Sequence, residues 1–558
     1  MNIRTSLIGL VLFSIIAFWG CNSSQQNENI TDEDSLIVEK SEMEKKVEQY
    51  ASFKLTTDLS VLTEKEKQML PLLFEAAKIM NDIYQTEVLY KYHKEKISDA
   101  DEATKKFYEI NYGPWGRLDG NISFIDGIGE KPAGSGFYPQ DMTKEEFDAF
   151  GDENKTSLYT IISKGENGEL LSTWYHEAFK EETEKAVELI KQAAELAEDA
   201  GLKKYLELRA EALLTDDYRA SDVAWLEMKD NTIDFVVGPI ENYEDALYGY
   251  KAAHESFILI KDKEWSKKLE KYTSLLPKLQ TLLPCEQAYK NETPGASGNQ
   301  LNAYDALYYA GDCNAGSKTI AINLPNDEWV RKEVGSRKLQ LKNSMRAKFE
   351  KILLPIADVM IDESQRKHLS FDAFFANTMF HEVGHGLGLS YTIADKNVTV
   401  REALKDCYTS IEEGKADILG LFVVDQLFEM GELGDVDLMD YYVTFFTSIF
   451  RSSRFGVASS HGKANMMRFY YFEENGAFEK NAETGLYKVN FEKMRECVKS
   501  LGEKILIIQG DADYEAAKAW IEKDGKVKEG FQKDLDKIND AGTPVDIVFK
   551  QGSEVLGL

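Results

Sequence analysis

Residues 370–389 read SFDAFFANTMFHEVGHGLGL, and this stretch holds the motif from which the rest of the chain is interpreted. Its apolar residues recur at helical spacing, and Ser370 is suited to cap a helix that begins after it. Positions i and i+4 lie on one face of a helix, so the imidazoles of His381 and His385 can reach the same metal ion. Glu382 follows the first histidine, where it can meet a water molecule at that ion. This HExxH spacing predicts a helical zinc site.

The alternative for the same motif is a helix with two half-buried histidines and no metal. Only 7 histidines occur among the 558 residues, so a chance match to HExxH is rare. Zinc is the expected ion, although cobalt or manganese can bind the same kinds of ligand.

A catalytic zinc site needs a third protein ligand and an open position. Residues 410–417, SIEEGKAD, contain the candidate Glu413, and Asp417 lies one helical turn after it. Glu413 would bind the metal, while Glu412 or Asp417 would orient the histidines by hydrogen bonds. The alternative is structural, because Ser410 and Glu413 also fit the S-x-x-E pattern of a capping box at a helix start. The spacing alone leaves ligand and cap both open.

Composition excludes several classes of protein. The chain has 558 residues, of which 43% are hydrophobic and 29% charged, enough for two or more domains with a sizeable core. Such a composition is neither disordered nor fibrous. The formal net charge of −30 makes nucleic-acid binding a poor hypothesis and gives no support to an electrostatic hold on anionic lipid. Only one long apolar run occurs, at the N-terminus, which excludes a polytopic membrane protein.

The N-terminus is typical of a bacterial lipoprotein signal. A basic residue precedes an apolar run over residues 7–19, which is too short for a comfortable membrane span, and Gly20 and Cys21 follow it. We expect a signal peptide over residues 1–20, lipid attachment at Cys21 and a flexible tether over residues 21–44. The expected location is the bacterial cell envelope, on the periplasmic or surface face of the outer membrane. The alternative is an ordinary secretory signal with an incidental cysteine.

Four cysteines remain after the signal. They show no CxxC spacing, so a cysteine zinc site is not expected. A bridge between Cys285 and Cys313 is compatible with an oxidising compartment, but unpaired buried thiols are favoured because a large core needs no cross-link. The other two cysteines are Cys407 and Cys497.

The body of the chain is predicted to be an α+β fold that is predominantly α-helical. Apolar residues at helical spacing predict helices over residues 64–97 and 176–200, the second ending at Gly201. After residue 328 nearly everything is expected to be helical to about residue 540. The expected strands cover residues 232–237, 256–260, 319–323 and 544–550.

Beyond the residues of the metal site, the chain contains several distinctive stretches between about residue 106 and residue 475. With the two metal motifs they are INYGPWGRLDG, KPAGSGFYPQDMTKEEF, GPIENYED, AGDCNAGSKTIAINLPND, HEVGHGLG, TVREAL, EEGKAD and SSHGKAN. Together they resemble the dipeptidyl peptidase III family of zinc metallopeptidases, metallopeptidase family forty-nine. The likeness is to a branch with a five-residue HExxH motif, whereas better-studied members have the six-residue HExxGH.

The resemblance implies a fold of two lobes around a wide cleft, one with a β-barrel core and one helical and zinc-bearing. The mixed lobe would comprise residues 45–262 and 300–350, rejoined by residues 541–558. The helical lobe would comprise residues 263–299 and 351–540.

The resemblance also implies roles for single residues of the metal site. Glu382 would be the catalytic base, and Glu412 and Asp417 would orient the ligands. The implied zinc ligands are His381, His385 and Glu413.

Three further motifs carry implied roles in catalysis and substrate binding. Tyr243 would help to stabilise the oxyanion, and His461 would support the tetrahedral intermediate. The residues implied to bind the free amino terminus and backbone of a peptide are Glu241, Asn323 and Asn326. Without the resemblance these residues would be an ordinary aromatic, an exposed histidine, a solvated carboxylate and two turn-forming asparagines.

Two further positions are less clear within these motifs. Glu255 is a weaker match to another carboxylate at the amino-terminal anchor. The family has an arginine where this chain has Asn465, so the contacts to substrate on that side are open.

The function that follows is a zinc-dependent exopeptidase that removes dipeptides from the free N-terminus of oligopeptides, with one Zn²⁺ per chain. Its partners would be oligopeptides and, through the lipid, a membrane, but no nucleic acid; the oligomeric state is open. The alternatives are a zinc endopeptidase or other zinc hydrolase, and a catalytically silent peptide-binding lipoprotein.

Overall fold

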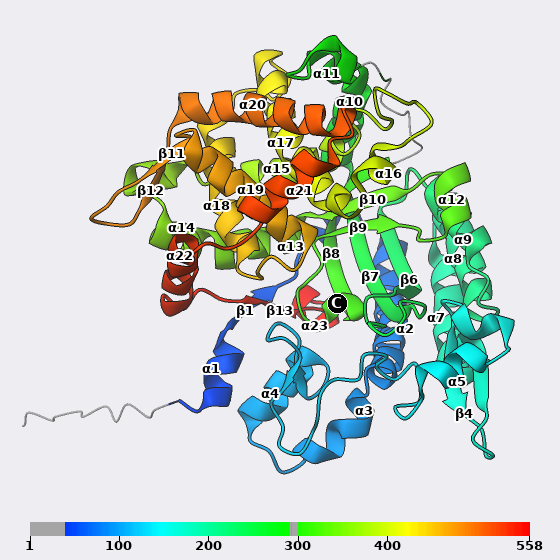
Figure 1. The fold of residues 1–558 in the computed structure, drawn as a ribbon. Helices are drawn as coiled ribbons and strands as arrows, with labels where there is room; N and C mark the ends of the chain where they lie inside the picture. Colours follow the sequence, from blue (N-terminus) through cyan, green and yellow to red (C-terminus); the bar gives the residue numbers. More distant parts are fainter. Residues whose placement is uncertain (1–39, 291, 293–299) are drawn as a thin grey trace, which may run out of the picture. The chain divides into compact units, whose positions relative to one another are not determined.

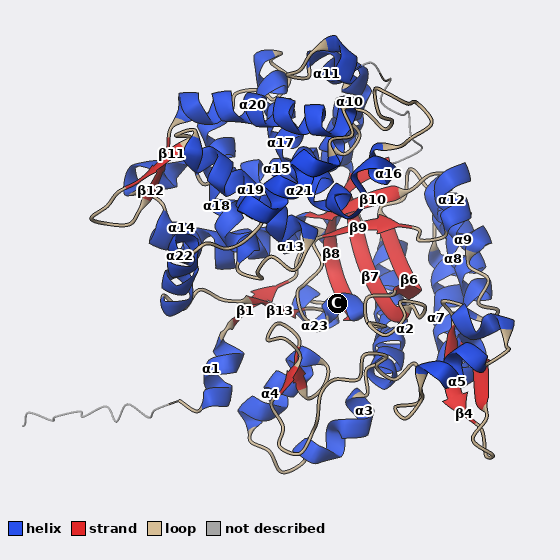
Figure 2. Ribbon diagram, viewed as in Figure 1, coloured by secondary structure: helices blue, strands red, loops and turns tan. Residues whose placement is uncertain are grey.

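The computed structural model describes residues 40–290, 292 and 300–558, most of which are helical (Figures 1 and 2). The expected signal peptide, Cys21 and most of the expected tether lie outside these residues. Helix α1 (Glu42–Glu48) begins within the last part of the expected tether. No helix in the described part of the chain is long and apolar enough to cross a membrane.

A five-stranded mixed sheet lies in the first two-thirds of the chain. In spatial order its strands are β6 (Ile233–Glu241), β7 (Ala253–Asp262), β8 (Gln300–Gly311), β10 (Arg337–Leu341) and β9 (Ala321–Leu324). Strand β7 is antiparallel to both of its neighbours, β6 and β8. Strand β10 runs parallel to β8 and antiparallel to β9. The sheet curls into a half-barrel, as the expected barrel core requires, and stays open because its outer strands β6 and β9 do not pair. Three of the four expected strands correspond to β6, β7 and β9.

Helices cover the sheet on the side of β6 and β7. The long helix α2 (Glu64–Glu87) begins with a capping box between Thr63 and Glu66 and packs against β7 and β8. The helices that pack around it or beside β6 are α7 (Lys180–Leu196), α8 (Ala200–Leu213) and α9 (Arg219–Glu227).

The expected helix end at Gly201 is wrong. Helix α7 ends at Leu196, and Gly201 lies in the first turn of α8. The side chain of Asp199 accepts a hydrogen bond from Leu202 N, so it caps a new helix at the place where the glycine suggested an end.

A buried arginine fixes the start of β10. Arg337 is fully buried, its Nη1 lies 3.2 Å from Asp234 Oδ2, and its guanidinium stacks over Trp225 at 4.4 Å. Its Nη2 also donates to the carbonyl oxygens of Trp225 at 2.7 Å and Met228 at 2.5 Å. Because side chains alternate along a strand, the neighbouring Lys338 faces the opposite side of the sheet.

Most helices after residue 341 form a group of their own (Figure 1). They are α13 (Lys342–Lys348), α14 (Leu354–Met360), α15 (Phe371–Gly384), α16 (Val400–Leu404), α17 (Tyr408–Glu429), α18 (Leu438–Ser453), α19 (Ser460–Glu474), α20 (Phe491–Gly510), α21 (Tyr514–Asp524) and α22 (Glu529–Asp540). The expected run of helix after residue 328 is interrupted by β10 and by the hairpin β11 (Phe478–Lys480) and β12 (Tyr487–Val489). The β10 sequence RKLQL alternates buried Leu339 and Leu341 with polar residues, a strand pattern too short to stand out.

The expected C-terminal strand is confirmed. Strand β13 (Asp546–Lys550) pairs in parallel with β1 (Tyr50–Lys54), so this C-terminal strand lies beside the first strand of the described residues. The remaining α-helices and strands are α3 (Tyr90–His93), α4 (Glu102–Asn111), α5 (Lys144–Ala149), α6 (Tyr175–Ala178), α10 (Lys263–Ser274), α11 (Leu276–Leu282), α12 (Glu328–Glu333), α23 (Ser553–Leu556), β2 (Trp115–Gly116), β3 (Ile122–Ser123), β4 (Thr160–Lys164) and β5 (Leu170–Trp174).

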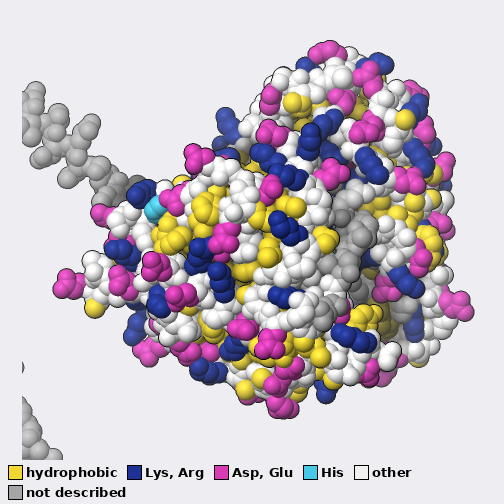
Figure 3. Space-filling model, turned by 90° about the horizontal axis from the view of Figure 1, so that it is seen from above, with side chains coloured by type: hydrophobic (Ala, Val, Ile, Leu, Met, Phe, Trp, Pro, Cys, Tyr) yellow, Lys and Arg dark blue, Asp and Glu magenta, His cyan; other side chains and the backbone are white. Residues whose placement is uncertain are grey.

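The described thiols are unpaired, and the surface carries charges of both signs. All four cysteines in the described part of the chain are free, so no bridge joins Cys285 and Cys313. On the face seen in Figure 3, acidic and basic side chains are interspersed, with apolar ones between them.

Two glycines bring α15 and α17 into backbone contact. A Cβ added at Gly384 would lie 2.4 Å from the carbonyl oxygen of Ala416, and one at Gly420 would lie 2.8 Å from His381 N. No side chain fits between the helices at these points. The helix with HEVGH therefore lies directly on the helix with EEGKAD.

Gly420→Ala is expected to lower the free energy of unfolding by about 1–3 kcal/mol, because the added methyl group overpacks this contact. Gly414→Ala on the same helix is the matched control, since its Cβ would meet nothing nearer than 3.8 Å. There the greater helix propensity of alanine, about 1 kcal/mol, is expected to dominate. Urea unfolding of both variants checks this, and equal stabilities would contradict the close contact.

Candidate functional site

The α15–α17 contact brings His381, His385 and Glu413 together. One potential ligand atom from each lies within 4.8 Å of the others. The Oε2 atom of Glu413 is 3.4 Å from His381 Nε2 and 3.7 Å from His385 Nε2. Helix α17 starts at Tyr408, so Ser410 lies inside it and does not cap it. The capping-box alternative for Glu413 is therefore wrong.

Carboxylates on α17 set the orientation of both imidazoles. The Nδ1 atom of His381 lies 2.7 Å from Asp417 Oδ1, and that of His385 lies 2.9 Å from Glu412 Oε1. With each Nδ1–H donated to a carboxylate, each Nε2 presents its lone pair towards Glu413.

These two carboxylates are themselves anchored and remain ionised. Burial acts to raise the pKa of Glu412, but the Lys415 ammonium, 2.9 Å away, and the hydrogen-bonded His385 together outweigh it and lower the pKa to about 2. Gln509 Nε2 donates to the other oxygen of Glu412 at 2.9 Å. Burial opposes ionisation of Asp417 as well, yet the guanidinium of Arg468 and the imidazole of His381 together hold the pKa of Asp417 well below its usual range.

The donor set fits a metal ion. Glu413 Oε2 is buried and accepts no hydrogen bond, although imidazoles surround it at ion-pair distances. Two imidazole nitrogens and one carboxylate oxygen are the ligands of many catalytic zinc sites, which keep a further position open. His381, His385 and Glu413 are thus the residues that can hold one zinc ion.

A second histidine–aspartate group lies at the start of α18. It contains His368, Asp437 and Asp440. Asp437 caps the helix by accepting from Met439 N, and Asp440 Oδ1 is 2.8 Å from His368 Nδ1. These contacts explain the group as a capped helix start with an ion pair.

A lysine on the sheet forms an ion pair with Glu382. Its Oε2 lies 2.6 Å from the ammonium of Lys338 on β10. Burial acts to raise the pKa of Glu382, but Lys338 and then His381 outweigh it, so the pKa is lowered. Lys338 pairs with Asn323 of β9 across the sheet, and cross-strand partners share a face. The register thus brings Asn323 to the same side as the expected base; the sequence analysis did not identify Lys338.

The expected peptide-binding residues line one cavity of about 540 Å³ on the sheet. Glu241, Tyr243, Glu255, Asn323 and Asn326 all lie on its wall. Glu255 Oε1 and Asn323 Oδ1 are buried there without a hydrogen-bond partner. Burial, and next the charge of a neighbouring aspartate, raise the pKa of Glu255 well above its usual range. Unpaired acceptors on a cavity wall suit a ligand with several N–H donors.

Two expected catalytic residues have different surroundings. His461 lies in the first turn of α19, and its Nδ1 lies 3.2 Å from Glu413 Oε2, so it adjoins the three potential metal ligands. Tyr243 lines the sheet cavity with its side chain 81% exposed, and no described contact joins it to the imidazoles.

Asn465 cannot replace an arginine that contacts substrate. It is buried, its Nδ2 donates to Ser452 Oγ at 2.9 Å, and its Oδ1 accepts from Arg468. Arg468 also donates to Asp417, which orients His381, so Asn465 stabilises the metal site indirectly through Arg468.

Comparison with known proteins gives consistent results. The model of peptidase family M49 matches residues 150–400. The protein named Nudix hydrolase 3 of Arabidopsis thaliana is 33% identical over 570 residues, which covers 90% of this chain and 73% of that protein. The protein named dipeptidyl peptidase 3 of Dictyostelium discoideum is 27% identical over 205 residues, which covers 36% of this chain and 28% of that protein.

Two solved structures share the fold. The structure of DPP III from Caldithrix abyssi has a TM-score of 0.86 and 38% identity, covering 91% of this chain and 98% of that one. The structure of dipeptidyl-peptidase III from Corallococcus sp. strain EGB has a TM-score of 0.74 and 36% identity, covering 91% and 96%. They confirm the expected mostly helical fold with two lobes, whereas the residue ranges of the lobes stay a prediction.

Glu412→Gln is expected to weaken zinc binding by about 10- to 100-fold, because it loosens the hydrogen bond that orients His385. Glu479→Gln, at an exposed position of β11, is the matched control. Competition with a chromogenic chelator measures both affinities. Equal affinities would show that Glu412 does not orient the ligand.

Proposed function

Because the chain belongs to peptidase family M49, we propose that it is a zinc-dependent dipeptidyl peptidase acting on the free amino terminus of oligopeptides. The observation that carries the proposal is that the potential metal ligands, Glu382 and the sheet cavity lie next to one another. The three potential metal ligands lie beside Glu382, and the β9–β10 register joins Glu382 to a cavity with unpaired buried acceptors.

His381, His385 and Glu413 would hold the ion. When bound, zinc supplies Lewis acidity that polarises a carbonyl and lowers the pKa of water towards ~7. Glu412 and Asp417 keep the imidazoles in the tautomer that can bind a cation.

Glu382 carries the proton transfers. It takes a proton from the attacking water and passes it to the amine that leaves. From strand β10, Lys338 holds the carboxylate of Glu382, which lies on α15. Its positive charge favours the ionised form of Glu382, which is the form that accepts a proton. His461, and Tyr243 once it turns inward from the cavity wall, stabilise the charge that develops on the carbonyl oxygen.

The sheet cavity sets where the peptide is cut. Glu241, Asn323 and Asn326 would bind the ammonium and backbone at the amino end of the substrate, with Glu255 as a further acceptor. Anchoring the amino terminus at one place leaves one peptide bond beside Glu382. A fixed distance from anchor to base is what yields dipeptides.

The location belongs to the same proposal. Lipid on Cys21, after removal of residues 1–20, would anchor the enzyme to the outer membrane of a bacterial envelope. Its support is the sequence FWGC at residues 18–21, which follows the apolar run.

Hydrolysis of Arg-Arg-naphthylamide by the form that lacks residues 1–21 tests the activity. We expect release of the intact dipeptide, loss of release with a chelator, and a fall of at least about 100-fold in Glu382→Ala. An N-acetylated copy of the substrate is the control and should not be cleaved.

Equal cleavage of free and acetylated substrates would indicate an endopeptidase or another hydrolase. No cleavage by zinc-loaded protein that still binds peptides would indicate a silent binding protein.

Lys338→Met is expected to lower kcat by up to about 100-fold with little change in KM, because Glu382 loses the partner that positions it. Lys338→Arg should restore most of the activity, since it keeps the positive charge. Lys332→Met, at an exposed position, is the control. A rise in KM without a fall in kcat would show that Lys338 binds substrate and does not position the base.

A further inference from the structure

Three of the distinctive sequence motifs meet at one buried carboxylate. Glu244 belongs to GPIENYED, and its side chain contacts Arg117 of INYGPWGRLDG together with Lys131 and Ser135 of KPAGSGFYPQDMTKEEF. Arg117 Nη1 donates to Glu244 Oε2 at 2.7 Å, and Lys131 Nζ donates to Glu244 Oε1 at 2.6 Å. Ser135 Oγ donates to the same Oε1. None of these four residues has a role in the mechanism proposed above.

The carboxylate of Glu244 is ionised although it is buried. Burial acts to raise the pKa of Glu244, but Arg117 and Lys131 together outweigh it and lower the pKa to about 2. Hydrogen bonds between charged groups are shorter and stronger than those between neutral groups. Glu244 is therefore firmly attached to two other segments of the chain.

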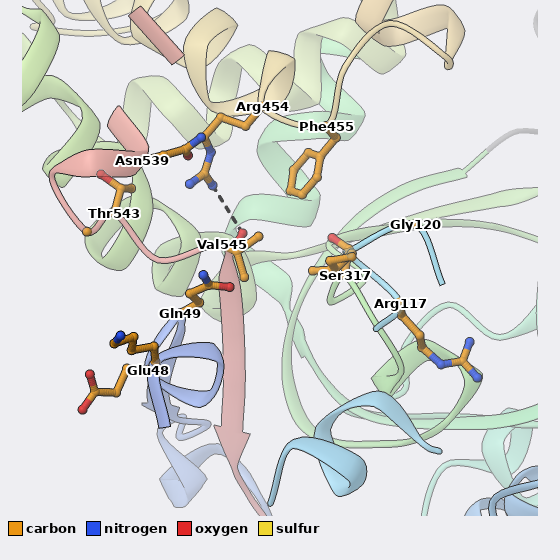
Figure 4. A pocket seen from close by; sticks show the side chains of 13 residues that line it. Glu48, Gln49, Arg117, Gly120, Ser317, Arg454, Phe455, Asn539, Thr543 and Val545 are labelled. Carbon is orange, nitrogen blue, oxygen red and sulfur yellow. Dashed lines mark hydrogen bonds between the residues drawn. The ribbon is translucent and has the colours of Figure 1, made fainter. Parts of the chain in front are cut away.

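Arg117 is committed to this attachment. Its Nε donates to Asn111 O at 2.7 Å, and its backbone N–H donates to Asn111 Oδ1 at 2.9 Å. Arg117 also lies on the wall of a second cavity, of about 980 Å³. Figure 4 shows its side chain directed away from Val545, another residue of that wall. The guanidinium thus serves Glu244 and leaves the cavity.

Glu244 directly follows Tyr243 in the loop that joins β6 to β7. On the other side of Tyr243, Asn242 Nδ2 donates to Gly249 O at 2.7 Å and closes the loop. Asp245 is buried and accepts hydrogen bonds from four backbone N–H groups further along the loop. These belong to Leu247, Tyr248, Tyr250 and Lys251. The backbone on both sides of Tyr243 is therefore held in place.

The side chain of Tyr243 is not restrained in this way. It is exposed on the wall of the sheet cavity, and no described residue forms a hydrogen bond with its hydroxyl. The charge of Glu241, and next burial, raise the pKa of Tyr243, so the hydroxyl keeps the proton that it would donate to an oxyanion. The side chain can turn, while its Cα stays where the loop holds it.

Glu244 also reaches the sheet cavity by a second route. The Arg117 guanidinium lies over the Tyr84 ring at 5.8 Å, and the Tyr84 hydroxyl donates to Asp312 Oδ1 at 2.9 Å. Asp312 lies on the cavity wall with Glu255. Burial, and next the charge of Glu244, raise the pKa of Asp312 to about 7. An effect carried by this route would change how the amino terminus of a substrate binds, and hence KM.

We propose that Glu244 is a positioning residue for Tyr243, and that Arg117 and Lys131 act through it. This inference rests on the proposed function, in which Tyr243 stabilises the charge on the carbonyl oxygen. The direct route is favoured because Glu244 adjoins Tyr243 in the chain, whereas the second route includes a ring contact of 5.8 Å. A fixed Cα limits the hydroxyl to the places that its rotamers allow, which lowers the entropy cost of reaching the carbonyl oxygen.

Substitutions made with and without the Tyr243 hydroxyl test the inference. With Arg-Arg-naphthylamide, Tyr243→Phe is expected to lower kcat by about 100-fold or more, as for other donors to an oxyanion. Glu244→Gln should lower kcat by about 10- to 100-fold and leave KM within about twofold of wild type. In the Tyr243→Phe background the same substitution should lower kcat by less than about twofold, because no hydroxyl remains to be positioned.

A milder variant guards against loss of the fold, since Glu244→Gln leaves two buried cations without their partner. Lys131→Met should lower kcat by about two- to tenfold, and Lys131→Arg should restore most of it because the charge is kept. The matched controls are Lys480→Met and Asp534→Asn. They break an ion pair of 2.6 Å to a buried carboxylate between β11 and α22, and they should keep the wild-type kcat.

Amide hydrogen exchange gives a readout that needs no turnover. The backbone N–H groups bonded to Asp245 are expected to exchange roughly tenfold or more faster in Glu244→Gln and in Lys131→Met, because the loop opens more often. In Lys480→Met these groups should keep the wild-type rate. Mass spectrometry of peptides that cover residues 242–252 measures all three variants.

Failure of the inference and failure of the proposed function give different results. If the wild-type protein cleaves Arg-Arg-naphthylamide, equal losses of kcat from Glu244→Gln with and without the Tyr243 hydroxyl overturn the inference. A rise in KM at unchanged kcat also overturns it, because the effect then belongs to the route through Asp312. If zinc-loaded wild-type protein cleaves nothing, the proposed function fails, and unchanged exchange in residues 242–252 overturns the inference separately.

Discussion

The backbone contact between α15 and α17 is the constraint on which the site depends. Gly384 and Gly420 let the helices approach without side chains between them, and the HEVGH and EEGKAD residues then face each other. At this separation, the carboxylates of α17 reach both Nδ1 atoms and Glu413 reaches both Nε2 atoms. A wider gap would break all of these contacts together, so packing and chemistry are set by one interaction.

The sheet makes the second contribution through its register. Arg337, buried against Asp234, fixes β10, and alternation then turns Lys338 towards Glu382 on the other face. Pairing of β10 with β9 places Asn323 beside Lys338. The same short strands thus connect the expected base to the cavity that would anchor a peptide.

Local patterns in the sequence were sufficient for some features and not for others. The Ser370 cap, the strands β6 and β7 and the grouping of His381, His385 and Glu413 follow from spacing, capping chemistry and family motifs. Strand β10 was missed because five residues give a weak periodic signal. The contact of Lys338 with Glu382 joins segments that are distant in sequence and meet only in the fold, so no local pattern indicates it.

The central claim is that one zinc ion at His381, His385 and Glu413 lies where Glu382 meets a peptide whose amino terminus is anchored on the sheet. The most direct measurement is a crystal structure of zinc-loaded Glu382→Ala with an uncleaved oligopeptide, recorded at the zinc absorption edge. The account predicts a single anomalous peak among these three ligands and a peptide ammonium within hydrogen-bond distance of Glu241 and Asn326. Zinc held by other residues, or a peptide bound with its amino terminus elsewhere, would contradict it.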